Sequence, residues 1–475
     1  MSLNKKSIFR VFIVLSSMIV SIYMYNNTMS YSLYKNYFFV PLFYGICISF
    51  LSKIDFFNFR FPGAIILNYT TIIKYLIMPF VMCLGNYYSW LGTMPSEKNI
   101  NYAIILTIIE MISVLLVSNY ISKKEIIVEK ESHNIKPLKS GFIHIIFIIL
   151  GFVTFILIPK AFEDYRFIFD TNDLATTIKV DFEFSGIYKT LFIFARYSLI
   201  ILLINYFYKR NLRKKSKINI LMSFVPVFLN CLYISNLSRI NICVPLFTFS
   251  ILIFLLFNEK SEQKLIIRLL LITLISSIVF MSALKFFGEG RGNEGKENDI
   301  AWWGDTLNMY FSGPKETAIG IKANDLIESE YGWKRYNLLI NDTFSNVIGL
   351  SNFTTKNNST TLYNYVYFSS TVAICQIVPN IIEGYYYFGF LFCFIWPVLF
   401  VFLCYYFNKK AQIAETLDLK FAYLYSSIYC GMVLMINSTM LIGNIINITL
   451  LFAIISAINN RIIMKRSCQN EQKEI

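Results

Sequence analysis

The composition of the chain indicates a membrane protein. Its 475 residues are 56% hydrophobic and 17% aromatic, and only 15% are charged, whereas soluble domains average about a quarter charged residues. The formal charge of +14 does not indicate a nucleic-acid partner, because the basic residues are spread over many loops rather than gathered in one domain or on one face. The nine cysteines show neither a disulfide framework nor the spacing of a metal site. No metal or cofactor is therefore predicted.

Apolar runs of membrane-crossing length recur along the chain. A bilayer core of roughly 30 Å needs about 20 apolar helical residues. The first run, 8–25, is interpreted as a signal anchor because no small-residue cleavage site follows it. The predicted fold class is an all-α polytopic membrane protein with about twelve transmembrane helices, at residues 8–25, 37–52, 63–84, 100–120, 141–159, 187–207, 218–234, 240–257, 265–287, 381–407, 420–438 and 440–458.

The loop charges predict the orientation of these helices. Lysine and arginine gather in alternate loops, and only Lys35, Lys98 and Arg239 fall in the short loops of the other side. The positive-inside rule then places both termini in the cytoplasm. Two of the outer segments are long. The predicted organisation is nine spans with an outer loop at 160–186 in residues 1–287, a large extracytoplasmic loop at 288–380, and three spans with a cytoplasmic tail in 381–475.

The segment "GRGNEG" at 290–295 matches the glycine pattern of a dinucleotide-binding turn. That pattern binds pyrophosphate only where a strand precedes it and a helix follows. Here it follows a predicted transmembrane helix on the outer side. We interpret it as a hinge, not as a nucleotide site.

The large outer loop is predicted to contain short amphipathic helices, because aromatic and aliphatic residues recur in it. Trp302, Trp303 and Tyr310 suit the C–H faces of sugars, and Asp305 lies among them. These aromatic residues equally suit a belt that anchors the loop at headgroup depth.

Four arginines on or near the predicted outer face could bind phosphate. A guanidinium stays charged and offers planar paired donors that match phosphate oxygens. Arg239 lies in a short outer turn and Arg196 lies within the sixth span, where a charge normally faces the protein interior. Arg166 and Arg291 lie in the two long outer segments. Headgroup anchoring or an internal ion pair is the alternative for each.

A carboxylate is the expected proton acceptor, because His133 and His144 fall on the predicted cytoplasmic side. Glu383 is the strongest candidate, since it begins the tenth span at the outer surface. An acidic residue there is also favoured by the helix dipole alone. Lys74 and Glu110 lie within spans and are expected either to pair or to mark a polar pathway.

Three segments carry a resemblance to a known family. They are "SNLSRINICVP", "YFSGPKETAIG" and "NIIEGYYYFGFLFCFIWP". Together with the layout of spans and one large outer loop, they resemble the Wzy-type polysaccharide polymerases of the bacterial cytoplasmic membrane. The family's motif of an arginine and a glycine with ten residues between them does not follow Arg166, Arg239, Arg291 or Arg335.

The resemblance implies a metal-independent, inverting glycosyltransferase without a cofactor. It would join undecaprenyl-pyrophosphate-linked repeat units into O-antigen or capsule on the outer membrane face. Its implied partners are the lipid-linked oligosaccharides, the bilayer, a chain-length regulator and a flippase. The residues expected to act in catalysis are Arg239, Arg291 and Glu383, and those expected to bind substrate are Arg166, Arg196, Trp302, Trp303, Asp305 and Tyr310.

Two alternatives remain from the sequence. An O-antigen ligase has a similar layout but typically carries a histidine in the large loop, and none is present here. A lipid-linked oligosaccharide flippase is expected to have short outer loops, and many transporters show internal repeats that this chain lacks.

Overall fold

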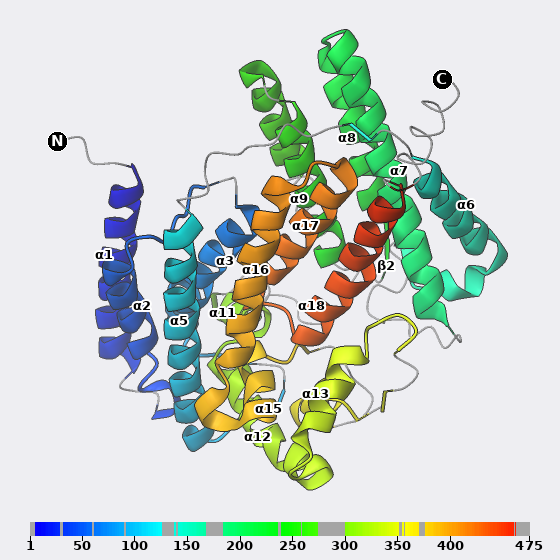
Figure 1. Cartoon of the computed structure of the whole chain (residues 1–475). Coiled ribbons are helices and arrows are strands. Elements are labelled where there is room, and N and C mark those ends of the chain that lie inside the picture. The colour runs from blue at the N-terminus through cyan, green and yellow to red at the C-terminus, as the bar shows by residue number, and fades with distance from the viewer. Residues whose placement is uncertain are drawn as a thin grey trace, which may run out of the picture. The chain divides into compact units, whose positions relative to one another are not determined.

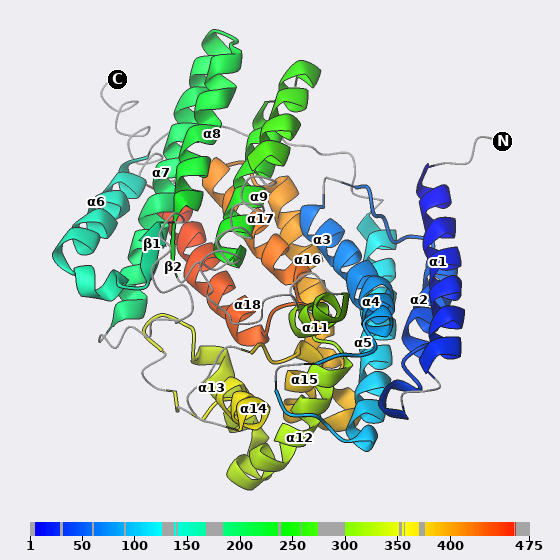
Figure 2. The same cartoon turned by 180° about the vertical axis from the view of Figure 1, so that it is seen from behind.

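The fold is described from a computed structural model of the chain (Figures 1 and 2). It forms two compact units, which are treated separately: unit 1 comprises residues 1–131, 293–409 and 427–443, and unit 2 comprises residues 132–292, 410–426 and 444–475. The structure describes residues 5–28, 32–58, 61–89, 92–125, 137–138, 141–167, 184–235, 239–257, 259–273, 300–350, 354–355, 357–369, 376–459 and 461.

The first part of unit 1 is a set of apolar helices. Helix α1 packs along α2, and α2 packs against α5 (Figure 1). The elements in chain order are α1 (Lys5–Thr28), the 3-10 turn η1 (Ser32–Tyr34), α2 (Phe39–Phe50), α3 (Pro62–Ile72), the π-turn η2 (Ile73–Ile77), α4 (Met78–Leu84) and α5 (Glu97–Glu125).

A π-turn interrupts the helix that runs from α3 to α4. Pro79 has no N–H, so it cannot donate to the carbonyl of Tyr75 four residues earlier. The regular hydrogen-bond pattern of the α-helix is therefore interrupted at the carbonyl of Tyr75, which lies within η2. Such turns are frequent at functional sites, and here the second residue of the turn is the buried Lys74.

The second part of unit 1 contains the short helices predicted within residues 288–380. Helix α11 packs against α4, and α12 packs against both α5 and α14. Pro314 begins α12, where its missing N–H costs nothing, and Gly332 with φ of +53° ends it. The elements are α11 (Ile300–Tyr310), α12 (Pro314–Tyr331), α13 (Arg335–Phe344) and α14 (Ser359–Phe368).

The predicted tenth span is not one straight helix. Its two halves, α15 (Asn380–Phe392) and α16 (Ile395–Ile413), meet at an angle of 115°. Gly389 has a φ of +74°, which a side chain with Cβ rarely adopts. Gly384 lets the turn close, because a Cβ there would lie 2.0 Å from the carbonyl oxygen of Cys393.

Unit 2 adds a short β-ribbon to the helices. Strands β1 and β2 pair antiparallel, with Tyr165 opposite Ser235. The elements are α6 (Phe142–Leu157), the 3-10 turn η4 (Pro159–Phe162), β1 (Tyr165–Phe167), α7 (Ser185–Arg213), α8 (Lys217–Leu232), β2 (Tyr233–Ser235), α9 (Arg239–Leu256) and the π-turn η6 (Ile445–Leu450); α17 (Leu417–Gly431) and α18 (Ser438–Asn444) divide between the units.

The structure is all-α in class, as predicted, and many of its helices are apolar. Among the described residues, five helices are long and apolar enough to cross a membrane, or six if the bent pair α15 and α16 counts as one span. The five run over Lys6–Asn27, Pro62–Leu84, Glu97–Lys123, Ser185–Arg213 and Ser438–Asn459. Four of the other predicted spans are apolar helices of 10–17 residues, shorter than a bilayer-crossing helix.

Candidate anion-binding cavity

A cavity of about 140 Å³ lies in unit 2. An apolar cavity of about 150 Å³ admits a benzene molecule, so a diphosphate or one sugar ring is of suitable size here. Two cationic side chains, Lys189 and Arg196, contribute to the wall. The rest of the polar lining comes from Tyr165, Tyr197, Asn230, Ser235, Asn241, Tyr425 and Asn444.

Arg196 is held in place by the end of a neighbouring helix. Its Nη2 atom donates a hydrogen bond of 2.6 Å to the carbonyl oxygen of Asn230. That carbonyl is one of the last four of α8 and therefore has no partner within the helix. The guanidinium also lies 5.5 Å from the ring centroid of Phe192. A cation is favoured at a helix C-terminus, so the α8 end fixes the arginine at the cavity.

Lys189 is held by a buried carboxylate. Its Nζ atom lies 2.9 Å from Oδ1 of Asp164, whose side chain is only 2% exposed. The hydroxyl of Ser235 donates to the other oxygen of Asp164. Because Ser235 pairs with Tyr165, the β-ribbon brings Asp164 beside it. Asp164 thus connects two residues of the cavity wall.

The other three predicted arginines are not seen at the cavity. Arg166 lies in β1 but does not line the cavity. Arg239 is the first residue of α9, and Asn241, two residues further, lines the cavity; the side chain of Arg239 is outside the described part. Arg291 lies outside the described residues altogether. Of the four, Arg196 is the arginine whose side chain is seen at the cavity.

The predicted sugar-binding residues belong to α11 in unit 1. The rings of Trp302 and Trp303 meet edge to face with centroids 5.1 Å apart, and the Trp303 side chain is 52% exposed. Tyr310 is also exposed at the end of the same helix. Asp305 is buried, with Oδ1 3.8 Å from Nζ of Lys315. The exposed and buried members of this set therefore face different surroundings.

A buried carboxylate that the sequence analysis did not single out lies next to Lys315. Glu316 accepts hydrogen bonds from the hydroxyls of Tyr363, at 2.8 Å, and Tyr367, at 3.2 Å. The amide of Asn308 donates to it at 3.3 Å. Burial raises the pKa of Glu316 to about 7, opposed by the charge of Lys315 and the hydroxyl of Tyr363. Sequence alone could not indicate these partners, because they come from α11, α12 and α14.

Glu383 is fully buried within unit 1. Its Oε2 atom accepts a 2.8 Å hydrogen bond from the backbone N–H of Ser438, the first residue of α18. The side chain therefore satisfies a helix N-terminal donor that has no partner inside its own helix. Nearby, burial raises the pKa of Asp342 to about 6, opposed by a hydrogen bond from the hydroxyl of Tyr387.

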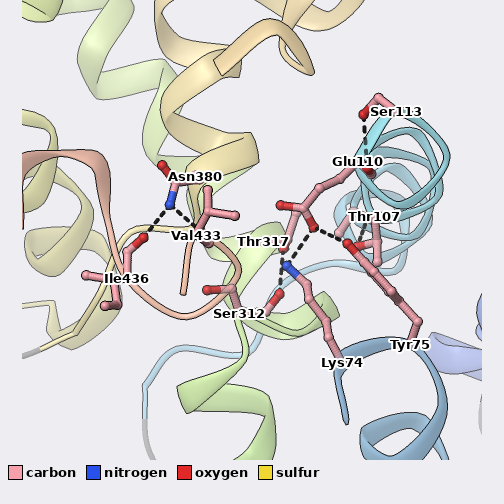
Figure 3. Close-up of polar contacts among 11 residues, drawn as sticks. Lys74, Tyr75, Thr107, Glu110, Ser113, Ser312, Thr317, Asn380, Val433 and Ile436 are labelled. Atoms are coloured by element: carbon pink, nitrogen blue, oxygen red, sulfur yellow. Dashed lines mark hydrogen bonds and ion pairs between the residues drawn. The ribbon is translucent and has the colours of Figure 1, made fainter. Parts of the chain in front are cut away.

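Lys74 and Glu110 form the pair that the sequence left open. Nζ of Lys74 lies 2.6 Å from Oε2 of Glu110, and both side chains are 1% exposed. The hydroxyl of Tyr75 donates to the same oxygen at 3.1 Å. Figure 3 shows Lys74 and Tyr75 converging on Glu110 from the π-turn. The pair ties the interrupted helix to α5.

A serine, a histidine and an aspartate meet in unit 2 but are sealed from solvent. His144 Nδ1 lies 3.2 Å from the Ser198 hydroxyl, and Nε2 lies 3.3 Å from Oδ2 of Asp418. All three side chains are buried. The contacts join α6, α7 and α17, which suits a structural connection rather than a nucleophile that must reach a substrate.

No group of three or more His, Cys, Asp or Glu side chains in the described part of the chain could hold a metal ion. No protein-family model, curated protein or solved structure matches the chain. The sequence predicted Arg196 as a substrate-binding residue and did not single out Lys189 or Asp164, which lie beside it. The available signal was weak: a lysine at the start of a predicted span and an aspartate near the start of the long outer segment 160–186.

Proposed function

We propose that the protein is a polymerase of lipid-linked oligosaccharides. It joins undecaprenyl-pyrophosphate-linked repeat units into a surface polysaccharide, O-antigen or capsule, at the outer face of the bacterial cytoplasmic membrane. The proposal includes the finer topology: about twelve spans across the bilayer, both termini in the cytoplasm, and residues 288–380 outside.

The observation that carries the proposal is the cationic cavity of unit 2. Arg196 and Lys189 line a space of about 140 Å³. The cavity is bordered by the β-ribbon, whose strands belong to the two segments that loop charges assign to the outer side. Phosphate oxygens match guanidinium and ammonium donors. A pyrophosphate-linked lipid that reaches the outer leaflet would meet this site without any soluble donor.

This placement supports a glycosyl transfer from a lipid diphosphate. A sugar hydroxyl of the acceptor attacks the anomeric carbon of the donor glycan, a new C–O bond forms, and the bond to pyrophosphate breaks. The electron pair leaves with polyprenyl pyrophosphate. Arg196 stabilises the negative charge that builds on the leaving group, in the manner of an oxyanion-binding donor. Holding both lipids side by side turns a bimolecular step into a positioned one. The hydroxyl proton passes to a carboxylate or to water.

A deletion strain tests the function. Loss of a polymerase leaves single repeat units on the lipid or cell surface, whereas loss of a flippase leaves no glycan outside. We expect short, single-unit glycans on gels of the deletion strain, and restoration of long chains by the wild-type gene. Surface polymer of unchanged length distribution in the deletion strain would sink the proposal.

Arg196→Gln is the matched variant for the cavity. We expect it to abolish restoration of long chains while the protein remains in the membrane at wild-type amount, because the guanidinium meets the leaving group. Arg213→Gln is the control, since Arg213 is exposed in the last turn of the same helix and does not line the cavity. Equal polymer from both variants would remove Arg196 from the mechanism.

A further inference from the structure

The wall of the cavity contains a second cation whose placement needs an explanation. Lys189 lies in the first turns of α7, and Arg196 lies seven residues further along the same helix. Two turns of a helix return a side chain to the same face. Both cations therefore face the cavity from one helix, and their backbone positions are set by that helix.

Asp164 fixes the direction of the lysine. A carboxylate that is 2% exposed requires a compensating charge and hydrogen bonds. It has both, in the ammonium of Lys189 and the hydroxyl of Ser235. An ammonium group has three N–H donors. The ammonium of Lys189 forms an ion pair with Asp164, while the side chain of Lys189 stays 23% exposed at the cavity.

The charges of this group favour an anion. Lys189 and Arg196 carry two positive charges and Asp164 carries one negative charge, so their sum is positive. The Oδ1 atom of Asn230 is buried and has no hydrogen-bond partner among the described residues. Asn230 lines the same cavity, so an acceptor for a ligand hydroxyl lies beside the two cations.

We propose that the cavity is a two-cation site for a diphosphate group, in which Lys189 binds the second phosphate and Asp164 is the positioning residue that holds Lys189. The inference rests on the proposed function for the identity of the whole lipid substrate. The phosphate chemistry itself is shared by a lipid diphosphate, a phospholipid headgroup and free phosphate. The presence of two cations in one cavity wall favours the diphosphate, because each phosphate then has a cationic partner.

Binding of inorganic pyrophosphate to the purified full-length protein in nanodiscs tests this site. We expect calorimetry to show pyrophosphate binding at least tenfold tighter than orthophosphate, because only the diphosphate can engage both cations. Nanodiscs with and without phosphatidylglycerol should give the same pyrophosphate affinity. Equal affinity for orthophosphate, or loss of pyrophosphate binding when phosphatidylglycerol is added, would overturn the diphosphate assignment.

The role of Lys189 needs a variant that folds. Lys189→Met alone leaves Asp164 buried without its cation and is expected to destabilise the protein. The comparison is therefore made in the Asp164→Asn background. We expect Asp164→Asn/Lys189→Met to bind pyrophosphate at least tenfold more weakly than Asp164→Asn. Equal affinities would mean that Lys189 only neutralises Asp164.

If Asp164 positions Lys189, replacing Asp164 should change the pyrophosphate affinity in the direction opposite to the one that charge alone predicts. Removing a negative charge near an anion site should tighten anion binding if charge alone matters. We expect Asp164→Ala instead to weaken pyrophosphate binding about tenfold, and Asp164→Asn, whose amide oxygen remains an acceptor beside Lys189, to restore most of it. Tighter binding in Asp164→Ala would overturn the role.

These outcomes are separate from those of the deletion strain. If pyrophosphate binds as expected and the deletion strain still makes full-length polymer, the two-cation site stands and the polymerase proposal fails. If the deletion strain gives single units but pyrophosphate affinity is unchanged in Asp164→Asn/Lys189→Met relative to Asp164→Asn, the role of Lys189 fails and the polymerase proposal stands.

Discussion

The buried carboxylates of this protein contact different groups, and these contacts indicate a different role for each. Asp164 contacts residues of the cavity wall, Glu383 contacts a helix N-terminus, and Glu316 accepts bonds from two tyrosines. A general base must come within hydrogen-bond reach of the proton it accepts. The contacts of Glu383 are with its own unit and favour a capping role, although the sequence suggested it as the base.

Substituting Glu383 separates the two roles. We expect Glu383→Gln to retain polymerisation, because the amide oxygen can still accept the N–H of Ser438, whereas Glu383→Ala should lose about 1–3 kcal/mol of stability through an unsatisfied buried donor. Thermal unfolding of purified protein and the polymer length in complemented cells are the two measurements. If Glu383→Gln is as stable as wild type but makes only single units, Glu383 is the base.

The pKa of Glu316 predicts a pH-dependent stability. Folding raises this pKa from 4.5 to about 7, so between those values the native state binds more protons than the unfolded state. The free energy of unfolding therefore falls as pH rises through this window and levels off above it. The shift corresponds to about 3 kcal/mol. Asp342, with a pKa raised to about 6, adds a change of the same sign.

The Glu316→Gln variant isolates this contribution. We expect the thermal midpoint of wild type, followed by tryptophan fluorescence, to fall from pH 5 to pH 8 more steeply than that of Glu316→Gln. The remaining slope of the variant would contain the part due to Asp342. Parallel curves for the two proteins would show that Glu316 does not change its protonation between those pH values.

At the scale of elements, the broken helices carry the polar chemistry. The π-turn η2 (Ile73–Ile77) presents Lys74 to Glu110 of α5, and the bend between α15 and α16 sets Glu383 against α18. Hydropathy predicted helices at both places, because apolar composition over about 20 residues is a local property. It could not predict the break at Gly389, since one glycine in an apolar run is also compatible with a continuous helix.

The candidate site shows the same division between local and long-range information. Arg196 was predictable because a charge within an apolar span is unusual. Lys189 and Asp164 were not, because their meeting depends on how the turn after α6 packs against α7 and on the pairing of β1 with β2. Likewise, Glu316 follows an unremarkable Pro-Lys pair, and its tyrosine partners come from α14, far along the chain.

The Lys74–Glu110 pair gives a prediction about the interrupted helix. Lys74→Met leaves a buried carboxylate without its cation, which should cost about 3–5 kcal/mol. The double variant Lys74→Met/Glu110→Leu removes both charges and should recover most of that loss. The yield of monodisperse protein and its thermal midpoint measure both effects. A double variant as unstable as Lys74→Met would mean that the unpaired charge of Glu110 does not explain the loss of stability.

At the scale of the whole molecule, the apolar helices indicate a membrane protein. Its proposed orientation is testable in unit 1. Figures 1 and 2 place α12 and α13 at the end of unit 1 opposite to the start of α1. The Trp333 side chain, in the turn between α12 and α13, is 82% exposed. Lys53, in the turn between α2 and α3, is also exposed and is predicted to face the cytoplasm.

Single cysteines at these two positions read out the orientation. In intact cells, we expect a membrane-impermeant maleimide to label Trp333→Cys but not Lys53→Cys, and both to be labelled after the membrane is permeabilised. The native cysteines in the described part are buried or half-buried, and wild type measures their background. Labelling of Lys53→Cys alone in intact cells would show that the topology is the opposite of the proposed one. It would also place residues 300–350 in the cytoplasm. A lipid-linked donor in the outer leaflet would then be on the opposite side of the membrane from these residues.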